Sequence, residues 1–338
     1  MTGALQPRRS KRWAWALSAA LLALAGCGSG SLSSAGSGGN GNGNGNGGNG
    51  NGVGGTTLTG LLYSASISPR SGLYKVLTDA TGEARIVNGT TSPTAPRFRF
   101  DGKKVAFTGF SSGSGVIGDS SISRLFTVNV DGTGQLQAPS SILYTNAFTP
   151  AFSPDGTKLV FVGEDPATTV RDIFTITLGG SVVQRLTNLG TGFNAGRPIY
   201  SPDGSKILYV RTPTNTLVAA SDIVKMNADG TNPLLLTPIS RDTQPNYSPD
   251  GSKIVFVSYR DGNNEIYVMN ADGTNPVRLT NNAGDDHAPV FSPDGTYIAF
   301  LSDRQTAGTF KLYSMKSDGT NVTKFSDVKV DRDYLDWR

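Results

Sequence analysis

The sequence predicts an all-β fold, a six-bladed β-propeller built from four-stranded antiparallel blades. Three observations lead to this prediction. A tight turn recurs along the chain, and an apolar run of strand length follows each turn. The N-terminal group of predicted strands lacks a first strand, which the C-terminal segment can supply. Repeats of roughly 40 to 50 residues are typical of propeller blades rather than of short helical repeats. The chain also begins with a leader and a low-complexity segment, which divide it into three parts.

The recurring turn has the form aromatic-Ser-Pro-Asp-Gly in four of its five copies. The copies are Pro96–Gly102, Phe152–Gly156, Tyr200–Gly204, Tyr247–Gly251 and Phe291–Gly295. Their aspartates lie 54, 48, 47 and 44 residues apart. Proline presets φ at the first central position of a turn, aspartate can accept a bond from the backbone two residues on, and glycine takes a positive φ without a Cβ penalty. Each copy therefore predicts a hairpin between the first two strands of a blade.

The remaining strands follow from the pattern within each repeat. The apolar run at 254–257 is continuous rather than alternating, which indicates a strand covered on both faces. A third strand is predicted at Glu265–Met269 and a fourth at Val277–Thr280, joined by a second tight turn at Asp272–Thr274. The same Asp-Gly pair recurs at 131–132, 229–230 and 318–319. Four short antiparallel strands per repeat are the anatomy of a propeller blade.

The two ends of the folded part are predicted to share one blade. Three segments resemble second, third and fourth strands with no first strand before them, namely Leu61–Ser64, Leu73–Val76 and Ala84–Val87. The segment Tyr334–Arg338 supplies the missing strand and places Trp337 in the position that the other repeats give to Phe or Tyr. Residues 56–338 then form six blades in a closed ring, which removes the open sheet edge that invites aggregation.

These repeats resemble the WD40-like Pro-Asp repeats of the TolB-type β-propeller family. The segment Ile266–Asn275 is similar to the Ile-Tyr-x-Met-x-x-Asp-Gly segment of that family, and the resemblance covers roughly residues 56–338. The chain departs from the pattern at Arg99-Phe100, which replaces Ser-Pro, and at Gly179-Gly180, which replaces Asp-Gly. The family's TolB proteins carry an α/β domain before the propeller and bind a peptidoglycan-associated lipoprotein. Because a Gly/Asn-rich segment stands there in this chain, we do not carry over that role.

Residues 1–26 have the features of a secretory leader, with a basic start, an uncharged apolar stretch and small residues. The segment Leu24–Cys27 resembles the lipobox of bacterial lipoproteins, which implies cleavage before Cys27 and lipidation of that residue. A plain signal peptide with an incidental cysteine and an uncleaved anchor are the alternatives. Residues 27–55 then form the lipidated cysteine and a disordered Gly/Asn/Ser linker with a reach on the order of 30 Å.

Composition limits the function classes. Four of the 30 basic residues lie in the leader, which has no acid, so 26 basic and 26 acidic residues remain in the mature chain. A neutral chain with scattered charges does not provide the basic footprint of a nucleic-acid-binding protein. His287 is the only histidine, which excludes a histidine-rich zinc site, and no calcium-loop motif occurs. We expect no cofactor, and the sequence leaves open whether a structural cation binds in the central tunnel. We expect a monomer.

Candidate binding residues lie where the variable loops of a propeller gather, on the face opposite the Asp-Gly turns. Nine polar or aromatic residues are predicted around the tunnel mouth on that face, each close to the start of a first strand: Arg197, Arg241, Asp242, Gln244, Asp285, Asp286, His287, Asp333 and Tyr334. Binding surfaces are often built from such loops on a rigid frame. The alternative is that each is an ordinary solvated loop residue, since charged residues are mostly exposed.

The sequence therefore predicts an exported, lipid-anchored propeller that acts as a protein- or peptide-binding scaffold. Its location would be the periplasmic face of the outer membrane or the cell surface, with the membrane reached through Cys27. No catalytic residues are assigned, and we do not expect an enzyme. Two alternatives use the same tunnel mouth, a propeller enzyme such as a lyase or a glycoside-active enzyme, and a carbohydrate-binding protein with Phe193, Tyr259 and Tyr334 as exposed aromatic candidates.

Overall fold

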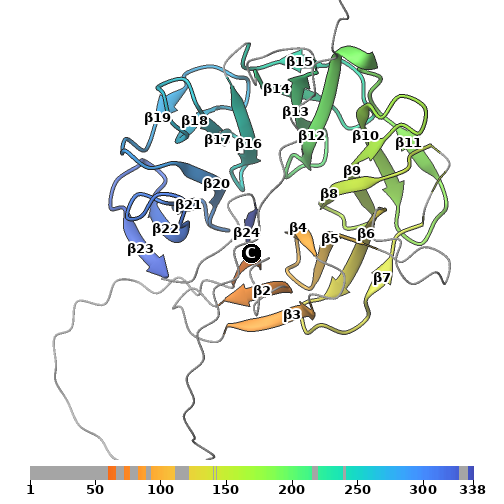
Figure 1. The fold of residues 1–338 in the computed structure, drawn as a ribbon, viewed down its shortest axis with the longest axis horizontal. Helices are drawn as coiled ribbons and strands as arrows, with labels where there is room; N and C mark the ends of the chain where they lie inside the picture. Colours follow the sequence, from red (N-terminus) through yellow and green to blue (C-terminus); the bar gives the residue numbers. More distant parts are fainter. Residues whose placement is uncertain are drawn as a thin grey trace, which may run out of the picture. The chain divides into compact units, whose positions relative to one another are not determined.

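The repeated motifs fold into short antiparallel sheets arranged around a central axis (Figure 1). The computed structural model describes residues 60–65, 72–76, 83–88, 93–110, 122–139, 141, 143–214, 220–238, 241–326 and 334–338. Residues 55–338 form one compact unit. The predicted signal peptide, the predicted lipidation site Cys27 and the predicted linker lie outside the described residues, as do the loop at 111–121 and Asp333.

Six sheets of four strands each make up the ring, and we number the blades from the one that contains the N-terminal strand. Blade 1 consists of β24 (Leu335–Trp337), β1 (Leu61–Ala65), β2 (Gly72–Val76) and β3 (Ala84–Asn88). Blade 2 consists of β4 (Thr94–Phe98), β5 (Lys104–Phe110), β6 (Ser123–Asn129) and β7 (Leu136–Gln137). Blade 3 consists of β8 (Ala147–Phe152), β9 (Lys158–Glu164), β10 (Arg171–Thr177) and β11 (Val183–Arg185).

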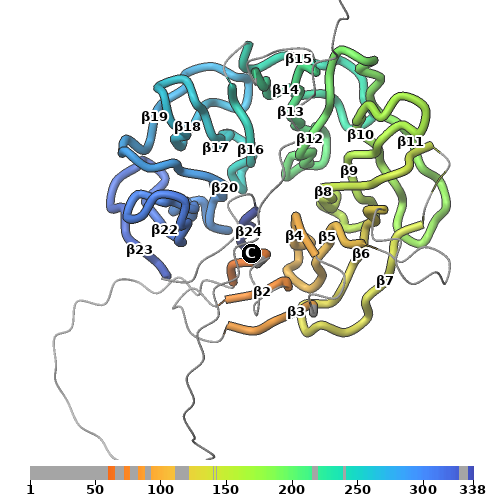
Figure 2. The backbone as a smooth tube through the Cα atoms, in the orientation of Figure 1, coloured from red at the N-terminus to blue at the C-terminus, as the bar shows by residue number. Residues whose placement is uncertain are grey.

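The other three blades repeat this order. Blade 4 follows a short 3-10 helix, η3 (Gly190–Gly192), and consists of β12 (Phe193–Tyr200), β13 (Lys206–Pro213), β14 (Asp222–Asn227) and β15 (Leu234–Leu235). Blade 5 consists of β16 (Asp242–Tyr247), β17 (Lys253–Ser258), β18 (Glu265–Asn270) and β19 (Val277–Arg278). Blade 6 consists of β20 (Asp286–Phe291), β21 (Tyr297–Ser302), β22 (Lys311–Lys316) and β23 (Thr323–Ser326). The first strand of each blade lies innermost (Figure 2). The predicted six-bladed propeller is confirmed.

The predicted closure of the ring by the C-terminal strand is also confirmed. Strand β24 pairs antiparallel with β1, with Trp337 opposite Leu61 and Leu335 opposite Tyr63. The C-terminal end consequently lies near the middle of the ring in Figure 1. Trp337 is 2% exposed and packs in an apolar cluster that joins blade 1 to blade 6. The two ends of the folded part therefore hold each other in place without a disulfide.

The apolar core lies between neighbouring blades, which explains why the second strands are apolar without alternation. Successive side chains of a strand point to opposite faces of the sheet. Leu61 belongs to the cluster shared with blade 6, whereas Leu62 belongs to the cluster shared with blade 2. Both side chains are buried. A strand packed on both faces by other sheets needs apolar residues at every position.

The Ser-Pro-Asp-Gly turns are held by the same hydrogen bonds in four blades. In blade 5 the Ser248 hydroxyl donates to Asp250 at 2.5 Å, and the backbone N–H of Ser252 donates to the same carboxylate at 3.0 Å. The backbone N–H of Lys253 donates to Ser248 Oγ at 2.9 Å. Gly251 has a φ of +72°, a value that favours glycine. The turn is thus determined locally by its own side chains.

Neutralising one of these aspartates should lower stability at neutral pH and not in acid. The hydroxyl of Ser248, then Ser252, holds the pKa of Asp250 at about 2. Because the pKa in the folded state lies below the unfolded value of about 3.9, the stabilisation is complete above pH 4 and is lost as the pH falls toward 2. We expect Asp250→Asn to melt at a lower temperature than the parent protein at pH 7, with the difference shrinking below pH 4 and vanishing as the pH falls through about 2. Circular dichroism melting at several pH values checks this.

Lys253→Gln, on the same turn, is the control, because its effect should stay constant over this pH range. A difference between Asp250→Asn and the parent that persists unchanged down to pH 2 would contradict the assigned role of the carboxylate.

Candidate functional site

The direction of the strands gives the ring two different faces. Each first strand ends in the turn that leads to the second strand, and the third strand ends in the turn that leads to the fourth. We call the face that carries these turns the turn face and the opposite one the loop face. The loop face carries the connections between the second and third strands and between successive blades.

The part of the chain that the structure describes contains no helix with the length and apolarity needed to span a membrane.

A bulge in each of five first strands positions the residues at the loop-face end of the tunnel. The register of the first strand shifts in blades 2 to 6. Within each shift one residue that is not glycine has a φ between +49° and +54° and is followed by proline: Ala95, Thr149, Arg197, Gln244 and Ala288. Tyr334 occupies the corresponding place before β24. Bulges of this kind redirect a side chain, and such strained backbone often lies at functional sites.

The loop-face mouth of the tunnel is almost closed by two of the predicted rim residues. The guanidinium of Arg197 lies 4.5 Å from the ring centroid of Tyr334. Arg197 belongs to blade 4 and Tyr334 precedes the inner strand of blade 1, which lies across the ring from blade 4. The cavity around this pair has a volume of only about 10 Å³. A ligand at this mouth would therefore bind on the surface.

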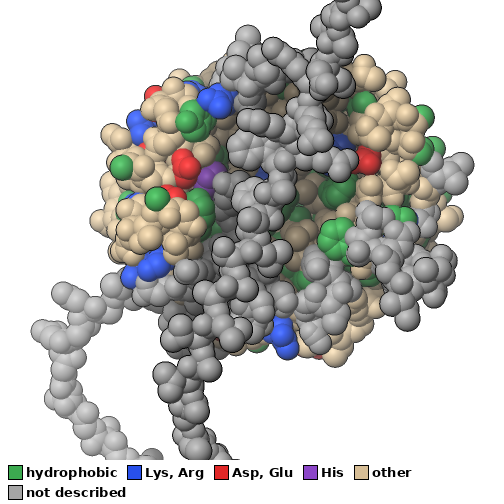
Figure 3. Space-filling model, viewed as in Figure 1, with side chains coloured by type: hydrophobic (Ala, Val, Ile, Leu, Met, Phe, Trp, Pro, Cys, Tyr) green, Lys and Arg blue, Asp and Glu red, His purple; other side chains and the backbone are tan. Residues whose placement is uncertain are grey.

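Four other predicted rim residues lie at or just inside this mouth. Arg241 stacks on Tyr259 at 4.2 Å. Gln244 is buried, and its side-chain oxygen accepts a hydrogen bond from the backbone N–H of Ala288. His287 is 7% exposed and contacts Phe310 edge-on at 5.2 Å, so only a small patch of histidine is visible in Figure 3. Asp285 accepts a hydrogen bond from the backbone N–H of Asn264 at 2.8 Å. These contacts hold the mouth rigid.

The prediction that Asp242 and Asp286 lie at the rim is wrong. Both side chains are fully buried and form ion pairs within their own blades, Asp242 with Arg260 at 2.9 Å and Asp286 with Arg304 at 3.0 Å. Burial raises the pKa of both aspartates, and the paired arginine opposes that rise. The two aspartates instead form a repeated ion pair between the start of the first strand and an arginine that follows the second strand.

Partly exposed arginine–aromatic pairs gather on the loop face. In each of four pairs an arginine guanidinium lies over an aromatic ring: Arg171 on Phe148 at 4.8 Å, Arg211 on Phe193 at 4.5 Å, Arg241 on Tyr259 at 4.2 Å and Arg197 on Tyr334 at 4.5 Å. We call these eight residues the arginine–aromatic cluster. They come from blades 3, 4 and 5 and from the start of β24. Three of them, Arg197, Arg241 and Tyr334, were predicted as rim residues.

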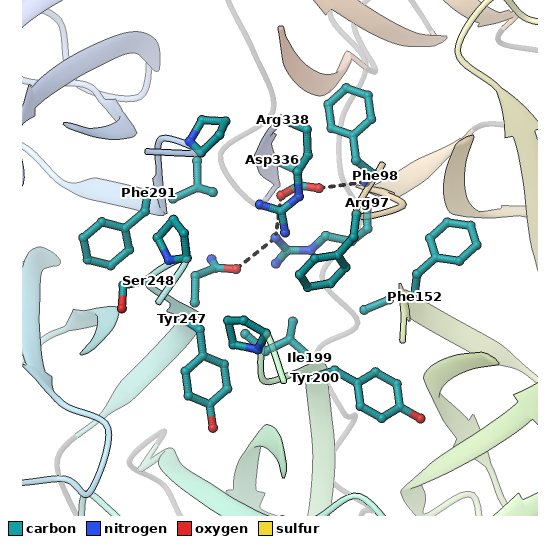
Figure 4. Close-up of a pocket in the computed structure, with 17 residues that line it drawn as sticks. Arg97, Phe98, Phe152, Ile199, Tyr200, Tyr247, Ser248, Phe291, Asp336 and Arg338 are labelled. Carbon is teal, nitrogen blue, oxygen red and sulfur yellow. Dashed lines mark hydrogen bonds and ion pairs between the residues drawn. The ribbon is translucent and has the colours of Figure 1, made fainter. Parts of the chain in front are cut away.

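A cavity lies at the other end of the tunnel, toward the turn face. It has a volume of about 340 Å³, and its lining includes the prolines of three turns, Pro202, Pro249 and Pro293. Figure 4 shows Arg97, Asp336 and Arg338 converging at its centre. Among the described residues, no group of three or more His, Cys, Asp or Glu side chains is placed to hold a metal ion. The structural cation that the sequence left open stays a prediction.

A polar bridge crosses the tunnel above this cavity. Arg97 Nη1 donates to Asn246 Oδ1 at 3.0 Å and lies 3.5 Å from Asp336 Oδ1. Asp336 Oδ2 also accepts the backbone N–H of Phe98 at 2.7 Å, and Asn246 Nδ2 donates to the carbonyl of Pro289 at 2.8 Å. Because Arg97 lies in blade 2 and Asn246 in blade 5, on opposite sides of the ring, this bridge divides the tunnel. The cavity of about 340 Å³ is therefore reached from the turn face.

Sequence reasoning missed the residues of this bridge, although the repeats carried a signal for them. They occupy the position directly before the inner aromatic residue, which alternation directs toward the tunnel. Three repeats have Ala151, Ile199 and Val290 there, and the other three have Arg97, Asn246 and Asp336. The departure at Arg99-Phe100 lies in the same region, where Phe100 lines the cavity and stacks under Arg338 at 4.6 Å. The positions at which the sequence departs from the repeat thus indicated which residues line the cavity.

Comparisons with known proteins agree with this architecture. The sequence model of the TolB beta propeller domain matches residues 240–332. The comparison with curated protein sequences gave no match. The structure is similar to the crystal structure of TolB from Acinetobacter baumannii, with a TM-score of 0.65 and 20% sequence identity over 82% of this chain and 65% of the other. This chain therefore spans about two thirds of the length of that TolB.

Two other solved structures have the same fold. A protein assigned as TolB from Agrobacterium tumefaciens has a TM-score of 0.63 at 20% identity, covering 84% of this chain and 99% of the other. An oligogalacturonate lyase in complex with manganese has a TM-score of 0.53 at 18% identity, covering 75% of this chain and 70% of the other. Likeness at this level of identity establishes the fold alone. The chain thus has the fold of the TolB-type β-propellers, and its residues 240–332 match the sequence model of the TolB beta propeller domain.

Proposed function

We propose that this protein is a binding scaffold that holds a protein or peptide partner on its loop face. The observation that carries the proposal is the arginine–aromatic cluster, four partly exposed guanidinium–ring pairs on one face of a rigid ring. Arginine and aromatic residues are enriched at protein interfaces and dominate their binding energy. Each ring presents an apolar surface beside a cation, which suits a partner with aromatic or acidic side chains.

The geometry of the mouth supports surface recognition rather than chemistry inside the tunnel. The Arg197–Tyr334 pair leaves a cavity of about 10 Å³ there, far smaller than the roughly 300 Å³ at which small-molecule pockets begin. His287 lies behind this mouth and is almost fully buried. A mouth without a deep cavity is suited to an extended peptide or a protein loop that binds on the surface.

The proposal includes the anchoring that the sequence predicts. A lipid on Cys27 and a linker over residues 28–55 would place the ring within reach of a membrane surface. We propose an envelope location on this basis, either the periplasmic face of the outer membrane or the cell surface. Labelling with radioactive palmitate, lost in Cys27→Ser, would support the anchor.

An enzymatic function is the alternative hypothesis, because an oligogalacturonate lyase has the same fold. A carbohydrate-binding role is a further rival, since rings such as Tyr259 and Phe193 can stack on sugars. Both rivals make a direct prediction for the purified protein. Formation of product from oligogalacturonate, or saturable binding of an envelope polysaccharide that competes with the captured protein, would replace the scaffold proposal.

The scaffold proposal is tested by capture from envelope extract with the lipid-free propeller, followed by affinity measurement with the identified partner. The double variant Arg171→Gln/Arg241→Gln should weaken the partner at least about tenfold, because interface arginines commonly contribute 2 kcal/mol or more. The matched control is Lys158→Gln/Lys253→Gln, which removes the same charge from the turn face, where both lysines are exposed. Equal loss in both double variants, or none in either, would contradict loop-face recognition.

A further inference from the structure

Two adjoining cavities lie at the turn face, one in the tunnel and lined by all six blades, the other beside it and lined mainly by blades 1 and 2. The first, of about 340 Å³, reaches the polar bridge, and the second, of about 420 Å³, extends outward past Lys75. They share four lining residues, namely Phe98, Phe100, Pro293 and Arg338. Both volumes lie in the range of small-ligand pockets. Nothing in the proposed loop-face interaction uses this end of the tunnel.

The charges in these cavities are unbalanced. Lys75, Arg97 and Arg338 are the cations of the lining, and Asp101 and Asp336 are its carboxylates. Asp101 is held by Arg99 of the same turn at 2.5 Å. Asp336 is shared between Arg97 and the backbone N–H of Phe98. Among the described residues, the side chains of Arg338 and Lys75 have no side-chain carboxylate partner, so the cationic side chains of the lining outnumber its acidic side chains by three to two.

Hydrogen-bond donors of both guanidiniums remain available. The two contacts of Arg97 use the same nitrogen, Nη1, so within the described part of the chain Nη2 and Nε have no acceptor. Arg338 uses Nη1 for the carbonyl of Trp337 at 3.3 Å, and its Nε is buried without a partner. Burial, together with the nearby charges of Arg197 and Arg338, lowers the pKa of Arg97 despite the opposing effect of Asp336. Leaving buried donors unpaired is costly, and an oxyanion would accept them.

The rest of the lining is apolar. Phe100 and three turn prolines, Pro202, Pro249 and Pro293, surround the position of the guanidiniums. Arg338 stacks on Phe100 at 4.6 Å, which holds its planar group in place. An inorganic dianion would gain nothing from these apolar walls and would be repelled by Asp336, 3.5 Å from Arg97. An anion of single charge with an apolar body satisfies both parts of the lining.

We propose that the turn-face cavity is a binding site for an organic carboxylate. The carboxylate group binds between Arg97 and Arg338, and the apolar body of the ligand packs against Phe100 and the turn prolines. The carboxylate can belong to a free small acid or to the C-terminus of a peptide, since both present the same group. This inference goes beyond the proposed scaffold function and does not depend on it, because the site needs no protein partner.

The test is calorimetric titration of the purified propeller with phenylacetate and with the uncharged phenylacetamide. We expect saturable binding of phenylacetate and at least about tenfold weaker binding of the amide, because charge-assisted bonds to a guanidinium are lost. A second arm compares the acetylated peptide Gly-Ala-Phe with a free and with an amidated C-terminus. Binding of phenylacetate alone identifies a small acid as the source, and tighter binding of the free peptide identifies a chain terminus. Either outcome supports the proposal.

Variants locate the binding to this cavity. Arg338→Gln should weaken phenylacetate at least about tenfold. The matched control is Lys158→Gln, which removes an exposed positive charge from the same face outside the lining of both cavities and should leave the affinity unchanged. Equal binding of acid and amide, tighter binding of inorganic phosphate, equal effects of the two variants, or no saturable binding up to about 20 mM would overturn the proposal. None of these results would affect capture of a partner at the loop face.

Discussion

Deleting Tyr334–Arg338 should abolish the stable ring. The deletion removes β24, so β1 loses its inner neighbour and exposes an unpaired edge. It also removes the buried side chains of Leu335 and Trp337 from the contact between blades 1 and 6. Burying a large aromatic and a leucine side chain together is worth about 5 kcal/mol or more, which corresponds to a fall in melting temperature of roughly 8 °C or more at this chain length.

Scanning calorimetry and size-exclusion chromatography measure this outcome. We expect the deletion variant to melt broadly at lower temperature and to associate, because an open edge strand pairs with other chains. Trp337→Phe is the control, since it keeps the strand and most of the buried area and should melt only a few degrees lower. A deletion variant that melts as the parent protein does and stays monomeric would show that the ring does not depend on this closure.

Arg304→Gln should destabilise blade 6 more than a typical surface substitution. The substitution leaves the fully buried carboxylate of Asp286 without its guanidinium and removes the stack of Arg304 on Tyr313 at 4.7 Å. Breaking a buried pair from one side costs about 3 to 5 kcal/mol, and because Arg304 is itself partly exposed we expect about 2 to 4 kcal/mol. Chemical denaturation at pH 7 measures the loss.

The effect should depend on pH in a direction that identifies the cause. Burial raises the pKa of Asp286 above the unfolded value, so its ionised form destabilises the fold above the folded pKa, and this penalty is lost as the pH falls through that pKa. The difference between Arg304→Gln and the parent should shrink from pH 7 toward pH 4. The double variant Arg304→Gln/Asp286→Asn should recover part of the loss at pH 7. Arg171→Gln, which breaks an exposed pair with Glu164, is the control and should cost less than about 1 kcal/mol at any pH.

The fold could be predicted in detail because its determinants are local and repeated. The turn at Ser248–Gly251 is closed by hydrogen bonds among its own residues, and the segment at 254–257 is apolar at every position because it is packed on both faces. The sharing of blade 1 by both chain ends was predictable because Trp337 repeats the aromatic position of the other blades. Each of these signals is carried by neighbours in the sequence.

The site was predictable only in part. Arg197 and Tyr334 do meet at the loop-face mouth, as their positions before the first strands indicated. Asp242 and Asp286 were placed there for the same reason, but their carboxylates are buried and pair with arginines that follow the second strands of their own blades. Whether a charged residue is solvated or paired depends on a partner 18 residues away, which the local pattern does not contain.

The sequence by itself determined the number of blades, the turns that separate their strands and the strand that closes the ring. Each repeat encodes one blade, and the apolar faces of a blade require neighbouring blades to cover them. Only the tertiary structure decided where a ligand can enter. Arg97 and Asn246 are 149 residues apart in the chain, and they meet only because blades 2 and 5 face each other across the ring. Contacts across a closed ring arise from its closure, and no local segment encodes them.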